Sequence, residues 1–278
     1  MQTIERVNQF KTARNQLTGT VGFVPTMGAL HEGHMALVRN ARAENINVIV
    51  SIFINPTQFG PSEDFTSYPR NAKRDIEMLQ KEGVRIVFMP TPEEIYPEGF
   101  NSWVEVKGIT DKLEGKARPG HFKGVTTVVA KLLNIVEPDK VYFGEKDAQQ
   151  LAVIRKMMND LSINIQLVSL PTVRESDGLA MSSRNAKLSP EERKAAVVLW
   201  KALGLARSQW EDGQRDASQI RKTMSSLIEK EPLAKIDYIS IADPQTLDEV
   251  DIVGKTALVS MAVYMGKTRL IDNIVLGG

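Results

Sequence analysis

The alternation of short apolar runs with longer amphipathic stretches is the feature that most restricts the fold of this 278-residue chain. Runs rich in Val, Ile and Phe are separated by stretches of helical period and by Gly and Pro, which is typical of parallel βαβ units. The expected strands are residues 22–24, 47–54, 85–89, 140–143 and 164–170. The expected helices between them are residues 34–44, 71–82, 126–136 and 147–161. Because βαβ crossovers are right-handed, we expect a doubly wound parallel α/β sheet that binds ligands at the carboxyl ends of its strands.

The pattern changes after Pro171, where a loop with two serines leads into the last third of the chain. Ser189-Pro190-Glu191-Glu192 has the composition of a helix start, with Ser as the N-cap and Pro at the first helical position. The expected elements that follow are helices over 190–210 and 216–230 and strands over 235–241, 257–265 and 269–276. We therefore expect a larger domain over residues 1–173 and a smaller α+β lid domain over residues 174–278.

Composition and charge exclude several classes of protein. Lys and Arg number 35 against 34 Asp and Glu, and a formal net charge of +1 does not favour a nucleic-acid partner. The absence of Cys excludes disulfides, thiolate nucleophiles, iron-sulfur clusters and Cys-based zinc sites. The longest apolar runs are far shorter than the ~20 residues that cross a membrane, and residues 1–20 contain no apolar targeting segment. We therefore expect a cytoplasmic protein with no membrane partner.

A loop with two glycines and two histidines joins the first expected strand to the first expected helix. Gly28 and Gly33 allow the backbone to approach a nucleotide, and the amides at the helix start are expected to point at an anion. His31 and His34 offer imidazole donors to phosphate oxygens. A zinc pair and an ordinary glycine turn remain as alternatives, although zinc favours His-Glu-x-x-His and no third ligand is evident. The loop has neither the P-loop pattern nor the dinucleotide-binding pattern.

Two further loops carry groups suited to small polar ligands or anions. Asn55 and Gln58 follow the second expected strand, where their amides suit a small polar ligand; a capped turn around Pro56 is the alternative. Residues 114–124 combine cations and glycines before a helix expected to begin near Val125, which suggests a mobile anion-binding lid or a solvated basic loop. His121 lies in this segment, so all three histidines are expected in loops before helices.

Residues 143–150 run from the end of an expected strand into a helix. Lys146 suits a phosphate, Asp147 suits a ribose hydroxyl or a plain N-cap, and Gln150 is expected to face the same crevice one turn later. Residues 181–184, Met-Ser-Ser-Arg, offer two hydroxyls and a guanidinium that suit a triphosphate, although Ser-rich loops are common.

In this order and spacing, residues 25–34, 55–59, 143–150 and 181–184 resemble the pantoate-beta-alanine ligases. The resemblance covers essentially the whole chain and includes residues 118–121, 171–175 and 269–273. It implies a Rossmann-like domain of the nucleotidyltransferase and class I tRNA synthetase type. In that class, a His-x-Gly-His element handles ATP, and residues 181–184 would correspond to the Lys-Met-Ser-Lys-Ser loop of the synthetases.

The resemblance also implies which residues form the site. The residues implied to contact ATP are Met27, Gly28, Ala29, Leu30, His31, Glu32, Gly33, His34, Gly144, Glu145, Lys146, Asp147, Val173, Met181, Ser182, Ser183 and Arg184. It implies that His34 is catalytic, that Gln58 and Gln150 hold pantoate, and that Gln58 also touches beta-alanine. Asn55 is a further candidate for substrate binding from its own position. We assign the stabilisation of charge around the reacting phosphorus to His31, His34, Lys146 and Arg184.

The implied reaction is ATP-dependent and passes through an acyl adenylate. The pantoate carboxylate attacks the α-phosphorus of Mg-ATP to give pantoyl adenylate and pyrophosphate, and the amine of beta-alanine then displaces AMP to give pantothenate. No enzyme nucleophile is required, which agrees with a chain that lacks Cys. Mg²⁺ is expected to bind mainly to phosphates, and the sequence identifies no ligand for it. The resemblance further implies a homodimer.

Three other functions remain open from the sequence. Another adenylyltransferase of the same superfamily would keep the His-x-Gly-His loop but act on a phosphate-bearing acceptor, which neutral amides at 55, 58 and 150 suit poorly. A nucleotide-binding regulatory module would keep the pocket without turnover. A tRNA-binding role lacks a basic surface in the sequence.

Overall fold

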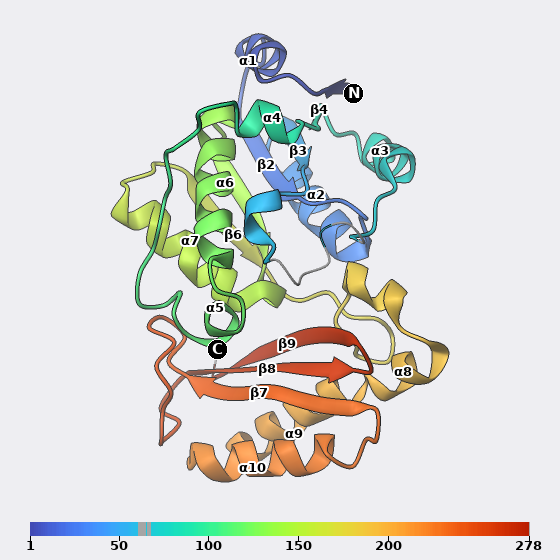
Figure 1. The fold of residues 1–278 in the computed structure, drawn as a ribbon, viewed down its shortest axis with the longest axis vertical. Coiled ribbons are helices and arrows are strands. Elements are labelled where there is room, and N and C mark those ends of the chain that lie inside the picture. The colour runs from blue at the N-terminus through green and yellow to red at the C-terminus, as the bar shows by residue number, and fades with distance from the viewer. Residues whose placement is uncertain (61–64, 66–67, 278) are drawn as a thin grey trace. The chain divides into compact units, whose positions relative to one another are not determined.

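The computed structural model describes residues 1–60, 65 and 68–277, and the chain divides into two compact units (Figure 1). Unit 1 consists of Met1–Glu145 and Val153–Pro171, and unit 2 consists of Lys146–Ala152 and Thr172–Gly278. The expected domain boundary between residues 173 and 174 stays a prediction. Among the described residues, no helix is both long enough and apolar enough to cross a membrane.

Unit 1 contains a six-stranded sheet in which every strand pair is parallel. Its strands are β1 Gln2–Ile4, β2 Val21–Thr26, β3 Asn47–Ile52, β4 Ile86–Phe88, β5 Lys140–Gly144 and β6 Gln166–Leu170. The order is β1-β4-β3-β2-β5-β6, so the chain leaves β2 in one direction toward β3 and returns on the other side of β2 at β5. The expected doubly wound parallel sheet is therefore confirmed, and the point between β2 and β5 is where such sheets bind ligands.

Helices cover the central strands of this sheet. The helices up to residue 160 are α1 Val7–Asn15, α2 Glu32–Glu44, α3 Ala72–Lys81, α4 Pro92–Ile95, α5 Leu113–Ala117, α6 His121–Val136 and α7 Ala148–Asp160, with short 3₁₀ segments η1 Pro56–Gln58 and η2 Glu145–Asp147. Met35 and Val38 of α2 and Leu79 of α3 pack in one core cluster with Val24 of β2 and Val50 of β3. Because side chains of β2 and β3 are buried on both faces, these strands are almost continuously apolar, as the sequence predicted.

The first element pair was not expected from the sequence. β1 extends the sheet beyond β4, and α1 contributes one fully buried side chain, Phe10, whose ring centroid lies 4.5 Å from that of Phe88. The remaining residues of α1 are mostly polar and partly or fully exposed. A single buried position gives no helical period, and this is why the sequence pattern did not reveal the helix.

Unit 2 contains a three-stranded antiparallel sheet and its helices. The elements are η3 Ser183–Lys187, α8 Pro190–Ala195, α9 Val198–Glu211, α10 Ala217–Ile228, β7 Ala234–Ala242, β8 Ala257–Met265 and β9 Thr268–Leu276. The strand order is β7-β8-β9, and α9 and α10 pack on the sheet through one apolar core (Figure 1). The expected small α+β unit is confirmed.

Two expected helices differ from the structure: one is divided in two, and the other begins earlier. The helix expected over 190–210 is divided, because Leu199 donates to Ala196 O at 3.2 Å, an i to i+3 bond that tightens the backbone between α8 and α9. The helix expected to begin near Val125 begins at His121. His121 and His34 are consequently in first turns of helices, not in the loops that precede them.

Candidate active site

The loop between β2 and α2 ends in a helix start that two histidines cap. His31 is the N-cap of α2, and its Nδ1 accepts a hydrogen bond from the Gly33 N–H at 3.2 Å. The Nδ1 of His34 accepts from the His31 N–H at 3.3 Å, which completes a reciprocal capping box. The ring centroids of His31 and His34 lie 4.0 Å apart. Because an accepting Nδ1 carries no proton, each neutral ring carries its proton on Nε2 and is a donor at that atom.

The backbone amides of this loop donate within the protein. Asp75 of α3 accepts from the Leu30 N–H at 2.8 Å and also from the Ala29 N–H. The N–H groups of His31 and Gly33 are bound to the two imidazoles. The prediction that the amides of this helix start point at an anion is therefore wrong for these residues. In this loop, the imidazole Nε2 atoms are the groups suited to an anion.

Asp75 holds the backbone of the histidine loop in an unusual conformation. Gly28 has φ +84° and Ala29 has φ +49°, and a Cβ on Gly28 would lie 2.9 Å from Ile52 Cγ2 and 3.1 Å from Asp75 Oδ2. The Asp75 side chain is 1% exposed, and this burial raises the pKa of the carboxyl despite its two backbone donors. Sequence reasoning missed Asp75, because nothing in a polar helix indicates that one of its carboxylates binds a distant loop.

The turn after β3 holds Asn55 and Gln58 through internal hydrogen bonds. Asn55 Nδ2 donates to Gln58 Oε1 at 3.0 Å, and Gln58 Nε2 lies 3.1 Å from Met27 Sδ. Asn55 Oδ1 accepts from the Thr57 hydroxyl at 2.9 Å and from the Tyr96 hydroxyl at 2.7 Å. Both the oxygen and the nitrogen of the Asn55 amide thus form hydrogen bonds within the protein, as expected for a capped turn around Pro56. The bonds also fix the Gln58 amide, with Oε1 toward Asn55 and Nε2 toward Met27.

Segment 114–124 packs against the same turn. His121 Nδ1 lies 2.8 Å from Gln58 O, and a carbonyl only accepts, so this nitrogen is the donor. Arg118 Nη1 lies 3.2 Å from His121 Nε2, which accepts because a guanidinium only donates. Gly124 lies so close to the turn that a Cβ there would be 2.4 Å from Thr57 O. Arg118, His121 and Gly124 therefore buttress Gln58, and closure of the segment as a lid stays a prediction.

The end of β5 completes the set of predicted residues in unit 1. Gly144 pairs with Leu170 of β6, and Glu145 accepts from the Ser169 hydroxyl at 3.0 Å. Because β2, β3 and β5 are parallel, their carboxyl ends lie at one edge of the sheet. Unit 1 thus brings together the predicted residues Met27, Gly28, Ala29, Leu30, His31, Glu32, Gly33, His34, Asn55, Gln58, Gly144 and Glu145.

The remaining predicted residues belong to unit 2. Lys146 and Asp147 lie in η2, with Lys146 Nζ 3.5 Å from Asp147 Oδ1, and Gln150 lies in the first turn of α7, half-buried. A bridge between Arg174 and Ala180 makes residues 173–181 a small hairpin, in which the Met181 N–H donates to Val173 O at 3.0 Å. The Met-Ser-Ser-Arg segment leaves the end of this hairpin.

The segment after the hairpin is itself capped and anchored. Ser182 caps η3, its hydroxyl accepting from the Arg184 N–H at 3.2 Å. Asn185 Nδ2 donates to Glu175 Oε1 at 3.0 Å and to Ala180 O at 3.1 Å. These bonds hold Ser182, Ser183 and Arg184 in a defined turn beside the hairpin.

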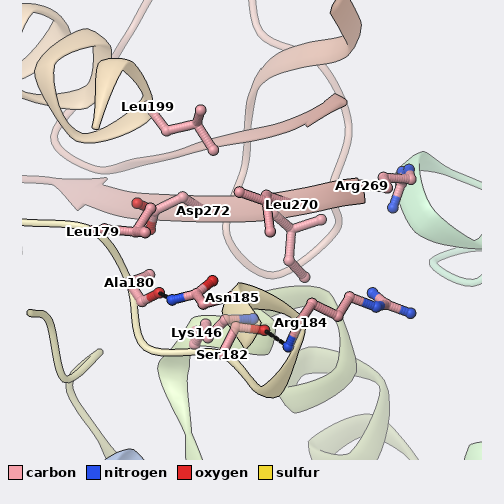
Figure 2. Close-up of a pocket in the computed structure, with 11 residues that line it drawn as sticks. Lys146, Leu179, Ala180, Ser182, Arg184, Asn185, Leu199, Arg269, Leu270 and Asp272 are labelled. Atoms are coloured by element: carbon pink, nitrogen blue, oxygen red, sulfur yellow. Dashed lines mark hydrogen bonds between the residues drawn. The ribbon is translucent and has the colours of Figure 1, made fainter. Parts of the chain in front are cut away.

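Unit 2 contains a pocket that gathers several of these residues (Figure 2). Figure 2 shows β9, with Leu270 and Asp272, on one side, and Lys146, Ser182 and Arg184 on the other. The residues that line the pocket are Lys146, Leu179, Ala180, Ser182, Arg184, Asn185, Leu199, Arg269, Leu270, Ile271 and Asp272. Two predicted phosphate cations, Lys146 and Arg184, therefore share one pocket with the predicted Ser182.

Metal-ligating side chains do not cluster in the part of the chain that the structure describes. Over residues 1–60, 65 and 68–277, no three His, Asp or Glu side chains gather as a metal site. These residues therefore do not form a protein cage of the kind that carries a tightly held structural ion.

Comparisons with known proteins agree on one family. The family model described as "Pantoate-beta-alanine ligase" matches residues 1–275. The pantothenate synthetase of Herpetosiphon aurantiacus is 54% identical over 277 residues, which cover 99% of this chain and 100% of the relative. A crystal structure of pantothenate synthetase from Thermus thermophilus has a TM-score of 0.94 at 46% identity, and covers 99% of both chains. A structure of the Francisella tularensis ligase, complexed with beta-gamma ATP and beta-alanine, has a TM-score of 0.82 at 38% identity, over 99% of this chain and 97% of that one.

Proposed function

The chain belongs to the pantoate-beta-alanine ligase family, and from this premise we infer that it condenses pantoate with beta-alanine at the expense of ATP. The observation that carries the inference is the family match over residues 1–275 together with 54% identity to a pantothenate synthetase along its whole length. The relative solved with beta-gamma ATP and beta-alanine supports two of the three substrates. The product is pantothenate.

We propose that the reaction has two steps. A carboxylate oxygen of pantoate attacks the α-phosphorus of ATP, the bond to the bridging oxygen breaks, and pyrophosphate leaves. The amine nitrogen of beta-alanine then attacks the acyl carbon of pantoyl adenylate, loses a proton, and displaces AMP. Because the adenylate is already an activated acyl group, the protein supplies position and charge stabilisation and no covalent intermediate of its own.

The histidine pair supports a role at the α-phosphate. The capping box fixes both rings through Nδ1 and so places the proton of each neutral ring on Nε2, and an N–H donor of this kind stabilises developing negative charge. We propose that His34 is catalytic and that His31 assists it. We propose that residues 27–33 also contact the nucleotide.

We propose that the cations of unit 2 bind the polyphosphate. Lys146 and Arg184 line one pocket with Ser182, and ammonium, guanidinium and hydroxyl groups are the usual partners of phosphate oxygens. Ser183, Met181 and Val173 contact the nucleotide from the same hairpin and turn, and Gly144, Glu145 and Asp147 contact it from the end of β5 and the segment that follows. Mg²⁺ would enter bound to ATP and would neutralise charge on the phosphates, and phosphate oxygens and water are the ligands that this ion usually keeps.

Pantoate is proposed to bind through two neutral amides, Gln58 and Gln150, and Gln58 also contacts beta-alanine. The fixed orientation of Gln58 supports this, because Asn55 accounts for its oxygen and directs its NH₂ group the other way. We propose that Asn55 acts on the substrates through Gln58. Direct contact of Asn55 with a substrate stays a prediction.

The assembly and location complete the proposal. The family resemblance favours a homodimer, which sedimentation equilibrium tests directly. We place the enzyme in the cytoplasm, because that compartment supplies ATP.

Product analysis tests the proposed function. With Mg-ATP, pantoate and beta-alanine, we expect free AMP, pyrophosphate and pantothenate in equal amounts, measured by mass spectrometry of the quenched reaction. Covalent retention of AMP in the final product would instead identify another adenylyltransferase. Nucleotide binding without pyrophosphate release would identify a binding module.

A further inference from the structure

We propose that Asn273 and the Arg174–Asp272 ion pair are positioning residues that fix Lys146 for adenylate formation. The proposal rests on the role of Lys146 given above under the proposed function. All four residues belong to unit 2, and the contacts among them lie inside that unit. None of the three positioning residues was identified as a site residue from the sequence.

A hydrogen bond joins the Asn273 side chain to the backbone of Lys146. Asn273 lies in β9 and is 7% exposed, and its Nδ2 donates to Lys146 O at 2.8 Å. The bond crosses between segments 127 residues apart in the chain. A lysine side chain has a long, flexible stem, so the position of its ammonium depends on how firmly its backbone is held. The Asn273 amide thus fixes the root of the side chain that is proposed to meet a phosphate.

The Arg174–Asp272 pair in turn holds Asn273. Arg174 Nη1 donates to Asp272 Oδ2 at 2.7 Å, and Nη2 donates to Oδ1 at 2.9 Å, a bidentate pair with Asp272 only 2% exposed. Asp272 Oδ1 also accepts from the Asn273 N–H at 2.8 Å, and Arg174 Nη2 lies 3.4 Å from Asn273 O. Both backbone polar groups of Asn273 therefore contact the ion pair.

The same guanidinium anchors the hairpin that carries the Met-Ser-Ser-Arg segment. Arg174 Nη1 donates to Gly178 O at 3.0 Å, and the guanidinium carbon lies 3.9 Å from the ring centroid of Trp200. Trp200 lies against Gly178, because a Cβ on Gly178 would be 1.9 Å from Trp200 Cδ1. One ion pair thus connects β9, the hairpin and, through Asn273, Lys146.

Arg174 also neutralises the charge of the Asp272 carboxylate, which is a second reason for the ion pair. Asp272 lines the pocket that contains Lys146 and Arg184. An unpaired carboxylate there would repel a polyphosphate. The bidentate bond to Arg174 engages both carboxylate oxygens, so the pocket keeps the positive character that ATP requires.

The test is a double-mutant cycle between Asn273 and Lys146, read by pantoate-dependent exchange between pyrophosphate and ATP. Asn273→Ala removes the tether without leaving a buried charge, and we expect kcat to fall about 10-fold with KM for pantoate unchanged. In a Lys146→Ala background, the same change should alter kcat less than ~2-fold, because the tether then has no ammonium to position. Arg174→Lys, which keeps a cation opposite Asp272, should lower kcat as Asn273→Ala does.

A matched control lies on the neighbouring strand. Ser260 pairs with Asn273 in the β8–β9 register, and its buried hydroxyl has no hydrogen-bond partner among the described residues. Ser260→Ala should therefore leave kcat and KM unchanged. Thermal melting of every variant separates loss of folded protein from loss of rate.

The outcomes distinguish the two proposals. Wild-type kcat in folded Asn273→Ala and in folded Arg174→Lys, beside a slow Lys146→Ala, would overturn the positioning role alone. Full additivity of Asn273→Ala and Lys146→Ala would also overturn it, because the loss would not pass through Lys146. Wild-type kcat in Lys146→Ala would instead overturn the role of Lys146 in the proposed function.

Discussion

A histidine that accepts a helix-capping hydrogen bond through Nδ1 performs two tasks with one ring. The cap fixes the position of the imidazole, and the accepted bond assigns the proton of the neutral ring to Nε2. His31 and His34 are bound to each other's segment in this way, so neither ring needs a carboxylate to set its tautomer. The loop sequence His-Glu-Gly-His is therefore both a structural cap and a pair of neighbouring imidazole donors.

Two substitutions of His34 separate these tasks. Asn places its side-chain oxygen near the position of Nδ1 and keeps the cap, whereas Gln places an NH₂ group near the position of Nε2. We expect His34→Asn to slow adenylate formation by at least ~10²-fold with little change in melting temperature, because the donor is lost. We expect His34→Gln to be more active than His34→Asn, because it keeps a donor near the position of Nε2. We expect it to be less stable than His34→Asn, because it loses the cap. Rapid-quench measurement of pantoyl adenylate, together with thermal melting, checks both variants. Near-normal adenylate formation in His34→Asn would show that this histidine is not catalytic.

Asp75 makes the stability of the histidine loop depend on pH. Its pKa is raised above 3.8 in the folded protein by burial, so the folded state binds this proton more tightly than the unfolded state does. The group's contribution to stability is therefore fully present below pH ~3.8 and is lost as pH rises through the raised pKa.

The difference between wild type and Asp75→Asn isolates this contribution. The free energy of unfolding of the wild type minus that of the variant should decrease as pH rises from about 3.5, and should level off above the raised pKa. Urea denaturation at a series of pH values measures it. A difference that increases with pH would mean that the two backbone donors outweigh burial.

At the scale of elements, the approach of α6 to the turn after β3 determines where Gln58 lies. Gly124 allows the close contact with Thr57 O, and His121 and Arg118 on the same segment bind Gln58 O. The start of α6 is thus a support for the substrate turn. The sequence indicated glycines and a histidine here, but not that the helix begins at His121 and carries His121 and Gly124 against the turn that contains Gln58.

Two glycine-to-alanine changes in helices provide a matched test of this support. In Gly124→Ala, the new Cβ would lie 2.4 Å from Thr57 O, so the turn must shift; we expect lower stability and a KM for pantoate raised about 10-fold or more. In Gly204→Ala, the Cβ meets nothing within 4 Å, so we expect unchanged kinetics and a gain of ~0.5–1 kcal/mol from helix propensity. Steady-state kinetics and urea unfolding of both variants give the comparison. Wild-type KM in folded Gly124→Ala would show that the turn does not depend on this contact.

At the scale of the whole molecule, the sequence predicted the parallel sheet, its ligand-binding edge and the small α+β unit. Buried strands and amphipathic helices are local patterns, and the chain order of βαβ units permits few topologies. The sequence did not predict the supporting roles of Asp75, Tyr96 or the Arg174–Asp272 pair. These residues act across long sequence separations, and an Asp or Arg bound to a distant backbone has the same local pattern as a solvated one. Local patterns thus predicted which groups suit the substrates, whereas the contacts that hold these groups in place were visible only in the fold.

The two units carry different sets of the predicted site residues. The histidines, Met27 and Gln58 belong to unit 1, whereas Lys146 and the Met-Ser-Ser-Arg segment belong to unit 2. We infer that unit 1 supplies the donors to the reacting phosphate and that unit 2 supplies the cations for the polyphosphate. We propose that both sets take part in the first step, before beta-alanine enters the reaction.

The most direct test is isotope exchange between pyrophosphate and ATP in the presence of Mg²⁺, with pantoate alone compared with beta-alanine alone. Reversible formation of pantoyl adenylate predicts exchange that depends on pantoate and is absent with beta-alanine alone. Absence of exchange with pantoate, in a preparation shown to bind both ATP and pantoate, would contradict the adenylate mechanism.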